Sequence, residues 1–423
     1  MGKIELDHTG SGSGITLSSD GTSLLLDGTA VGGGADLYAA NESSPSAQPS
    51  ATGANAISIG DNAVASNTQN IAIGHDSEAS TGTYNFAFGS GATANASYYA
   101  VAIGSDAGGN GSTAGGNGSF ATSGGVTAGN QAQALGKAYA SGTDSFAAAI
   151  ANNTSSYGAT GANSIAMGYQ SKATSSYSIA IGRQNIAQSN VSSTSIGGKS
   201  NTASGHYSII AGGNLNNATS SRSSVLGGQS NDATAQYSVV AGGLNSTASG
   251  EYSAAFGGSV NTASGHYSFA HGYYAVASQY GQEAHASGRF AANGDAQGRT
   301  FILRADTTDA TATVLTTNNS TASTDNQIVA ASDTCIMFSG TLVAMQNGAQ
   351  DQGGWEIKGL LKNDGGTTTL VSSNIQTFSD GNSWTVALSA DNTNNALAIT
   401  CTGEAAHNIR WVANISTSEV TYA

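Results

Sequence analysis

The sequence predicts an all-β protein. A parallel β-solenoid shaft of 14–15-residue repeats is expected over residues 51–281, followed by a β-sandwich or jelly-roll-like domain over residues 282–423. Three observations predict this fold class. Glycines recur at a fixed spacing, a short apolar strand pattern precedes each of them, and longer strands replace both after about residue 299. A recurring unit of this length is typical of solenoids, in which each repeat stacks on its neighbours.

The glycines mark the repeat. Their spacing is 14 or 15 residues in two runs, Gly60, Gly74, Gly89 and Gly104, then Gly168, Gly182, Gly197, Gly212, Gly227, Gly242, Gly257 and Gly272. The stretch 105–164 is irregular and is expected to form a loop or degenerate coils. At a strand spacing of about 4.8 Å, the repeats would give roughly 15 coils and a length on the order of 70 Å.

Each repeat contains two short strands. In Ile71-Ala72-Ile73-Gly74 two large side chains flank a small one, which is a period-two strand ended by a turn. A weaker segment follows each turn, as in Ala63-Val64-Ala65. A Tyr-Ser pair precedes the next strand at Tyr177, Tyr207, Tyr237, Tyr252 and Tyr267. One repeat is therefore one coil of a parallel solenoid.

The two large positions form two bulky columns. The column just before the glycines is Ile59, Ile73, Phe88, Ile103, Met167, Ile181, Ile196, Ala211, Leu226, Ala241, Phe256 and His271. The narrow interior of a 15-residue coil explains the small residues between the columns. A single thin solenoid would leave an apolar stripe in water. We therefore expect a homotrimer whose chains cover one another, and either column is a candidate for the face toward its axis.

Beyond residue 299 the sequence predicts longer strands. They are Phe301–Leu303, Cys335–Met345, Trp355–Lys362, Trp384–Ala390, Ala396–Cys401 and Ile409–Ile415. Turn signals such as Asn363-Asp364-Gly365-Gly366 separate them. Each tryptophan alternates with apolar residues, as Trp384 does with Val386 and Leu388. Core packing is therefore expected in preference to stacking on a sugar.

The two cysteines, Cys335 and Cys401, lie in predicted strands. We expect buried free thiols, as suits assembly in a reducing cytoplasm, and a bridge between the two strands is the alternative. Two cysteines alone do not make a metal cage.

Composition and charge exclude several classes of function. The net charge of −14 argues against binding to nucleic acid or to an anionic membrane surface. The first residues show no signal peptide, and no apolar run approaches the roughly 18 residues of a membrane helix. Charged residues are only 9% of the chain, but the regular apolar pattern favours ordered repeats over disorder.

Catalytic and cofactor motifs are not found. Glycoside hydrolysis commonly uses two carboxylates, and within residues 54–281 only Asp76 and Glu78 are close in sequence, flanking a predicted turn. An Asp-x-Glu pair on a turn is usually solvated. The glycine-rich runs lack the Lys-Ser/Thr of a phosphate loop, and aspartates do not recur as in calcium-binding nonapeptide repeats. We expect no enzyme activity and no cofactor.

One histidine interrupts a bulky column. His271 occupies the position held by Leu226 and Phe256 in other coils. If this column faces the axis of a trimer, three copies of His271 would converge and could bind a metal ion or an anion. The alternative is a hydrogen-bonded histidine at the last coil.

The repeat units resemble a known family. Asn70-Ile71-Ala72-Ile73-Gly74 and Ser164-Ile165-Ala166-Met167-Gly168, each followed by a small-residue segment, resemble the head repeats of trimeric autotransporter adhesins. The resemblance covers roughly half of the chain and implies a left-handed parallel β-roll in a trimer. The expected secretion signal, coiled-coil stalk and membrane anchor of that family are not recognised in this sequence.

Two further segments resemble phage proteins. The segment from Met1–Gly10 through Leu24–Gly28 resembles the N-termini of structural proteins of marine phages. His285–Phe290, with Gly294–Gln297, resembles the start of their C-terminal fibre domains. These resemblances imply attachment to the virion at the N-terminus and a distal C-terminal domain.

The resulting prediction is a homotrimeric virion fibre, such as a tail fibre, that attaches to the host surface. Residues 1–50 would contact other virion proteins, and residues 282–423 would bind a cell-surface glycan or protein receptor. No receptor-contact residue is assigned. The alternatives are a purely structural head or tail decoration, a polysaccharide-depolymerising tailspike, and a bacterial surface adhesin.

Overall fold

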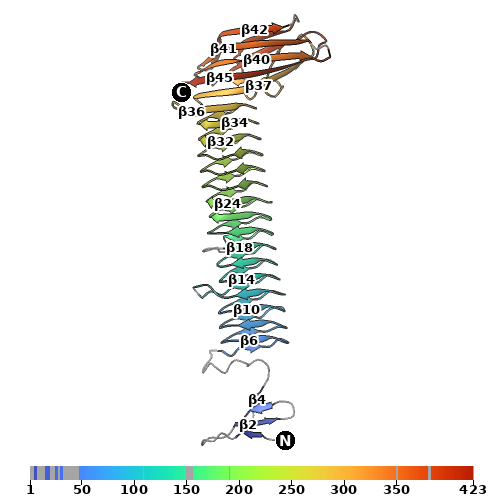
Figure 1. Cartoon of the computed structure of the whole chain (residues 1–423), viewed down its shortest axis with the longest axis vertical. Coiled ribbons are helices and arrows are strands. Elements are labelled where there is room, and N and C mark those ends of the chain that lie inside the picture. The colour runs from blue at the N-terminus through green and yellow to red at the C-terminus, as the bar shows by residue number, and fades with distance from the viewer. Residues whose placement is uncertain are drawn as a thin grey trace. The chain divides into compact units, whose positions relative to one another are not determined.

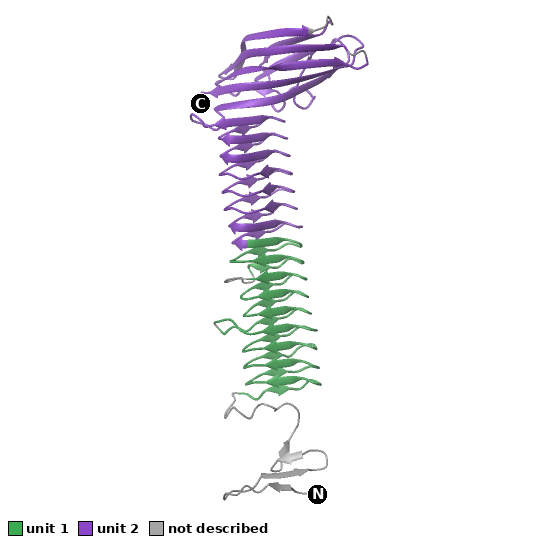
Figure 2. Ribbon diagram, in the orientation of Figure 1, with its two compact units in different colours: residues 1–181 green, residues 182–423 purple. Residues whose placement is uncertain are grey.

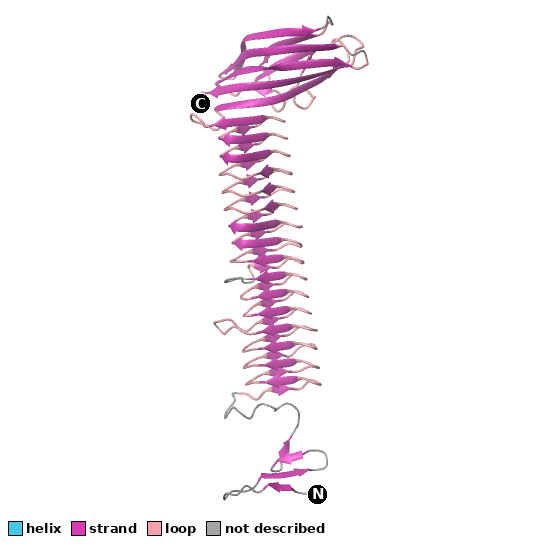
Figure 3. Cartoon of the chain, viewed as in Figure 1, coloured by secondary structure: helices cyan, strands magenta, loops and turns pink. Residues whose placement is uncertain are grey.

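The computed structural model of the chain contains strands, turns and loops (Figure 1). It describes residues 47–107, 109–148, 156–189, 191–348, 351–379 and 383–422, together with four short strands nearer the N-terminus. No helix occurs among these residues (Figure 3), and so none that could cross a membrane. The predicted all-β class is confirmed.

The chain divides into two compact units, residues 1–181 and residues 182–423 (Figure 2). This division falls inside the run of repeats, so the predicted boundaries after residues 50 and 281 stay predictions. The four strands nearest the N-terminus form an antiparallel sheet in chain order, β1 (Ile4–Leu6), β2 (Ile15–Ser19), β3 (Leu24–Leu26) and β4 (Thr29–Val31). The rest of residues 1–46, which belong to the predicted virion anchor, lies outside the described residues.

Unit 1 is a parallel β-solenoid with two ladders of short strands. The first ladder is β6 (Ile57–Ile59), β8 (Ile71–Ile73), β10 (Phe86–Phe88), β12 (Val101–Ile103), β14 (Phe120–Thr122), β16 (Gln133–Leu135), β18 (Phe146–Ala148), β20 (Ile165–Met167) and β22 (Ile179–Arg183), at which the unit ends. The second ladder is β5 (Ser50–Ala51), β7 (Val64–Ala65), β9 (Glu78–Ala79), β11 (Thr93–Ala94), β13 (Thr113–Ala114), β15 (Val126–Thr127), β17 (Tyr139–Ala140), β19 (Gly158–Ala159) and β21 (Lys172–Ala173).

The irregular stretch 105–164 forms coils and not one long loop. Ala102 pairs with Ala121, which pairs with Ala134, which pairs with Ala147. The register advances by 13 residues from Ala121 to Ala134 and by 13 again to Ala147, so these coils are shorter than the others. The expectation of degenerate coils is confirmed, and the changed coil length is what breaks the glycine period.

Unit 2 begins with the same two-ladder solenoid. Its first ladder contains β24 (Thr194–Lys199), β26 (Ile209–Ile210), β28 (Ser224–Val225), β30 (Val239–Val240), β32 (Ala254–Ser259), β34 (Phe269–Tyr273) and β36 (Glu283–Ser287). Its second ladder contains β23 (Ile186–Ala187), β25 (Thr202–Ala203), β27 (Asn217–Ala218), β29 (Asp232–Ala233), β31 (Thr247–Ala248), β33 (Thr262–Ala263) and β35 (Val276–Ala277). Figure 1 labels β24, β32 and β34 in this stack.

The interior of the solenoid is narrow, as predicted. The small residues between the two bulky columns, such as Ala72 and Ala87, are fully buried, and so are Ala65 and Ala79 of the facing ladder. Where the central residue is larger, as at Ile210, it is also fully buried. Both bulky columns point outward, because alternate side chains of a strand lie on opposite faces.

A ladder of buried asparagines, which the sequence analysis did not identify, runs up the solenoid of unit 2. Asn216 donates its backbone N–H to Oδ1 of Asn201 at 3.0 Å, and its own Oδ1 accepts from the backbone of Asn231 at 3.0 Å. Its Nδ2 donates to the carbonyls of Gly212 and Gly228 at 2.9 and 3.1 Å. Each amide therefore satisfies backbone groups of its own coil and of the next one, which stabilises the buried corner of the coil.

The C-terminal domain, also in unit 2, consists of two antiparallel sheets. The larger has the order β37 (Ala296–Thr307), β45 (Ile409–Thr421), β40 (Thr334–Gln346), β41 (Gln352–Asp364) and β42 (Thr367–Ser379). In the smaller, β44 (Ala396–Thr402) pairs with β38 (Thr313–Val314), β39 (Ile328–Val329) and β43 (Thr385–Asp391). β37 also pairs antiparallel with β36, which joins this domain to the last coil of the solenoid.

One hydrophobic core lies between the two sheets, as in a β-sandwich. All three tryptophans are in it, with the rings of Trp355 and Trp384 5.4 and 5.8 Å from that of Trp411. The prediction that the tryptophans pack in the core is confirmed. Cys401 is buried in the same core and Cys335 is half-buried, and both are free thiols. The predicted free state is confirmed, whereas full burial holds for Cys401 only.

Candidate functional site

One face of the larger C-terminal sheet is not covered by the smaller sheet. Side chains alternate along each strand, so the residues between the core positions point to this open face. Asp306 of β37 pairs with Arg410 of β45, which pairs with Met345 of β40. On the next row of this face, Val412 pairs with Val343. The open face therefore combines charged and apolar side chains.

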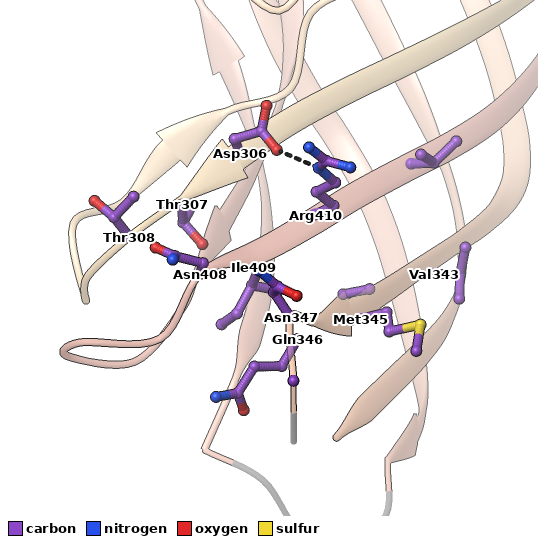
Figure 4. Close-up of a pocket in the computed structure, with 13 residues that line it drawn as sticks. Asp306, Thr307, Thr308, Val343, Met345, Gln346, Asn347, Asn408, Ile409 and Arg410 are labelled. Atoms are coloured by element: carbon purple, nitrogen blue, oxygen red, sulfur yellow. Dashed lines mark hydrogen bonds and ion pairs between the residues drawn. The ribbon is translucent and has the colours of Figure 1, made fainter. Parts of the chain in front are cut away.

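A pocket of about 760 Å³ lies on this face, at the end of the sheet where three strands meet their loops (Figure 4). It is lined by Asp306, Thr307, Thr308, Val343, Ala344, Met345, Gln346, Asn347, Gly348, Asn408, Ile409, Arg410 and Val412. The backbone N–H of Asn347 donates to the carbonyl of Asn408 at 2.9 Å and ties two of the loops together. The volume falls within the range of small-molecule sites in proteins.

The polar rim of the pocket is built around an ion pair. Nε of Arg410 lies 3.3 Å from Oδ1 of Asp306, and both side chains are largely exposed. Oδ2 of Asp306 accepts from Nδ2 of Asn319 at 2.8 Å, which holds the carboxylate in place. The guanidinium has five N–H donors, and only Nε is used in the contact with Asp306. The rim thus presents fixed donors and acceptors beside an apolar wall.

The apolar wall is formed by aliphatic side chains that water contacts directly. Val343 and Met345 are 57% and 56% exposed, and Val412 is 43% exposed. A wall of this kind next to convergent polar groups is the usual composition of a ligand site. No glycine spacing or charge run predicts this pocket, because its residues come from three strands that are far apart in sequence.

A second candidate surface is the outward face of the first solenoid ladder, here called the apolar face. In unit 1 it exposes Ile57 and Phe88, at 46% and 47%. In unit 2 it exposes Leu226 and Phe256, at 55% and 47%. Contiguous apolar side chains of this size are rare on the surface of a monomeric protein.

Three tyrosines of the Tyr-Ser pairs, Tyr237, Tyr252 and Tyr267, form a stack on the surface of the solenoid. The rings of Tyr237 and Tyr252 lie 4.7 Å apart, and those of Tyr252 and Tyr267 lie 4.8 Å apart. The guanidinium of Arg222 sits 5.2 Å from the Tyr237 ring and 5.6 Å from the ring of Tyr207. Because the ring faces contact one another, the stack presents ring edges and hydroxyls to solvent. The ring faces between Tyr237, Tyr252 and Tyr267 are therefore not available for a sugar to stack on.

The structure also places the residues singled out in the sequence. Nδ1 of His271 lies 3.1 Å from Nδ1 of His285, so His271 has a polar neighbour one coil away. Asp76 contacts His75 at 3.0 Å, and Glu78 bonds to Ser80, so the two carboxylates are engaged with different neighbours.

Two segments of the solenoid are similar to a known family of repeats. Residues 51–77 and 159–185 match the YadA head domain repeat. Each matched segment contains two successive strands of the first ladder, β6 and β8 or β20 and β22. In these two segments the YadA-type repeat corresponds to the coils of the solenoid, in agreement with the predicted adhesin-head pattern.

The tailspike protein of the Acinetobacter phage vB_ApiP_P1 is a similar solved structure, with a match that covers 89% of this chain and 78% of that chain, at 10% sequence identity and a TM-score of 0.21. No curated protein sequence matches the chain.

Proposed function

We propose that the protein is a homotrimeric, non-enzymatic fibre of a phage virion that attaches to the host surface. In this proposal residues 1–50 bind other virion proteins, residues 51–281 form the shaft, and residues 282–423 contact the receptor. The observation that carries the proposal is the exposed apolar face on a solenoid of YadA-type repeats. A face of this kind suits burial against other copies of the same chain.

The apolar face supports the trimer because every coil from β6 to β34 contributes at least one large apolar side chain to it. Full burial of a Leu or Phe side chain contributes about 1.5–3 kcal/mol, and Leu226 and Phe256, which are 55% and 47% exposed in one chain, would gain part of this on assembly. Repetition along the solenoid multiplies this gain, while closed three-fold symmetry limits the assembly to a finite size.

Light scattering coupled to gel filtration tests the assembly. The mass of the eluted full chain, given by light scattering, is expected to be three times the 41.7 kDa of one chain. The double substitution L226E/F256E places two charges on the apolar face and is expected to shift the protein toward monomer. T219E, at an exposed turn residue, is the matched control and should remain trimeric. A stable wild-type monomer would refute this part of the proposal.

The pocket of the C-terminal sheet is the proposed receptor contact, with a surface glycan as its ligand. Sugars offer hydroxyl groups to a polar rim such as that of Asp306 and Arg410, and C–H faces to an apolar wall such as that of Val343 and Met345. Several copies in a trimer would increase the effective affinity of a weak individual contact.

Binding of labelled protein to candidate host cells tests the receptor role. R410A and M345S are expected to reduce binding, whereas K362A is the control, because Lys362 forms a comparable exposed ion pair with Asp364 at 3.3 Å. Equal binding by all three variants would place the receptor contact elsewhere. No binding by the wild type would favour a decoration fibre, and loss of viscosity of a host polysaccharide would establish a depolymerase.

The position on the virion needs a separate experiment. Labels attached to either end of the chain and located on intact particles by electron microscopy are expected to place the N-terminus at the particle and the C-terminus away from it. The reverse order would contradict the assigned roles of residues 1–50 and 282–423.

A further inference from the structure

Two histidines are stacked on the last coils of the solenoid in unit 2. β34 and β36 are parallel, and their register places His271 directly beside His285. The two ring centroids are 4.5 Å apart, and the two Nδ1 atoms are 3.1 Å apart. Parallel strands about 4.8 Å apart bring equivalent side chains together in this way. His271 is half-buried and His285 is exposed, so both imidazoles are accessible from solvent.

The separation of the two Nδ1 atoms suits a shared metal ion. Zinc binds imidazole nitrogen at about 2.0–2.1 Å in tetrahedral geometry, which puts two nitrogen ligands of one ion about 3.3 Å apart. The observed 3.1 Å is close to this value. In the absence of an ion, the same distance fits a hydrogen bond in which one Nδ1 carries the proton.

Neighbouring groups orient the two rings. Oε1 of Glu283 lies 3.5 Å from Nε2 of His271, whereas Nδ1 of the same ring contacts His285. A metal-binding histidine usually directs its other ring N–H to a carboxylate, which leaves the ligating nitrogen unprotonated. Phe269 stacks on the His271 ring at 5.1 Å. A Cβ at Gly272 would lie 2.1 Å from the carbonyl oxygen of Ala286 and 3.0 Å from Nδ1 of His285, so the glycine allows the close approach of the next strand and of that imidazole.

We propose that His271 and His285 form a binding site for a divalent transition metal such as zinc. Their two Nδ1 atoms are the protein ligands of one chain, and Glu283 is a positioning residue that acts through His271. Imidazole is a preferred ligand of zinc, copper and nickel. Within the part of the chain that the structure describes, no group of three or more His, Cys, Asp or Glu side chains could hold an ion. Water therefore completes the coordination of an ion held by one chain.

His271 and His285 belong to the first ladder, at the register position of Phe256, so the proposed trimer would cover them together with the apolar face. The contact between their two Nδ1 atoms nevertheless lies within one chain and needs neither a virion role nor a trimer. It differs from the convergence of three His271 side chains expected from the sequence, because both ligands come from adjacent coils of a single chain. Loss of the site would leave the proposed fibre function intact, and loss of the fibre function would leave the site intact.

Zinc titration of the metal-stripped full chain tests the proposal. Calorimetry is expected to show one zinc ion per chain, and H271F or H285F should each lower the affinity at least about tenfold. Phenylalanine is chosen because Phe256 occupies the register position next to His271 one coil earlier, so the coil accepts it. H266A is the matched control, because His266 is also an exposed histidine near a carboxylate, 3.7 Å from Glu251.

A positioning role for Glu283 makes a separate prediction. E283A is expected to weaken zinc binding by about 10–100-fold, and E283Q should recover most of the affinity because its amide oxygen can still accept from Nε2 of His271. Cobalt added to the wild type should give the visible absorption of a nitrogen-ligated ion, and H271F should lose it. The proposal is overturned if the wild type binds no zinc, if either phenylalanine variant binds as well as the wild type, or if H266A loses binding equally.

Discussion

Arg299 and Glu419 form a buried ion pair where the C-terminal sheet meets the last coils of the solenoid. Nη2 of Arg299 lies 2.5 Å from Oε2 of Glu419, and the two side chains are 4% and 6% exposed. Nη1 of the same guanidinium donates to Oε1 of Gln279 at 3.1 Å. Burial lowers the pKa of Arg299 and raises the pKa of Glu419, and in each case the partner charge opposes the shift. Each charge is therefore unfavourable in this location without the other.

Removing one member of this pair is expected to destabilise the C-terminal domain strongly. R299M or E419Q should lower the free energy of unfolding by about 3–5 kcal/mol, because each leaves a buried polar or charged group without its partner. The double variant R299M/E419L should recover most of this loss. Calorimetry of the thermal transition of the domain measures both effects.

The exposed pair of Asp306 and Arg410 is the control for that experiment. Its side chains are 54% and 89% exposed, so R410A should change the free energy of unfolding by less than about 1 kcal/mol. If R299M and R410A lowered the free energy of unfolding by similar amounts, burial of the Arg299–Glu419 pair would have no energetic consequence.

The stability of the same region depends on pH through the carboxylate of Asp295. Burial opposes the ionised form, but N–H bonds from Phe290, Ala291 and Ala292, at 2.6–2.9 Å, outweigh it and keep the pKa of Asp295 below its usual value. The ionised carboxylate therefore stabilises the fold above the unfolded pKa of about 3.9, and this contribution is lost as the pH falls through the lower folded value.

The substitution D295N should accordingly lower the melting temperature at pH 7. The loss should correspond to about 1.5–3 kcal/mol, the usual contribution of a hydrogen bond to a charged group. The difference between wild type and D295N should shrink as the pH is lowered below about 4. A difference that is constant from pH 7 to pH 3 would contradict the assigned role of the carboxylate.

Substitutions in the asparagine ladder are expected to destabilise the solenoid of unit 2 to different degrees. N216L removes an amide that satisfies the backbone of Asn231 and the carbonyls of Gly212 and Gly228. Each buried group left unsatisfied costs about 1–3 kcal/mol, so the solenoid of unit 2 should unfold at a clearly lower denaturant concentration. N216S should be milder, because Ser246 occupies this rung naturally and its Oγ accepts from the backbone of Asn261 at 3.3 Å. Equal destabilisation by both substitutions would argue against the ladder.

The two thiols should differ in reactivity. Burial raises the pKa of the Cys401 thiol to about 12, so almost no thiolate is present at pH 8. Cys335 is half-buried. In the folded protein at pH 8, iodoacetamide should label Cys335 and leave Cys401 unmodified, and C335S should abolish the native-state labelling. Mass spectrometry locates the label, and both thiols should react after denaturation.

The solenoid could be predicted from the sequence because each coil repeats one local pattern. The triplet ending at Ile73 shows the alternation, and stacking in register follows from it. The coils that contain Ala121, Ala134 and Ala147 were harder to predict, because their period is 13 residues and the regular glycine is replaced by Ser123 after Ala121 and by Ala149 after Ala147. A search for glycines at a fixed spacing fails where the coil length changes, even though each of these coils keeps its interior alanine.

The C-terminal domain was predicted less completely. The strand Thr367–Ser379 was not expected, because its polar and largely exposed sequence lacks an apolar alternation. The pocket could not be predicted because Asp306 and Arg410 become neighbours only through the pairing of β37 with β45. The partner of His271 was missed for a similar reason, since His285 follows after the glycine run has ended.

The constant 15-residue step between Asn201, Asn216 and Asn231 has an evolutionary consequence. Asn201, Asn216 and Asn231 occupy equivalent rungs, and each bonds only to the rungs immediately before and after it. A duplication or deletion of a 15-residue segment, such as the one from Asn216 to Asn231, would restore the same contacts at the new joint. Genetic recombination between repeats would thus change the length of the solenoid by about 4.8 Å per coil and keep the same fold.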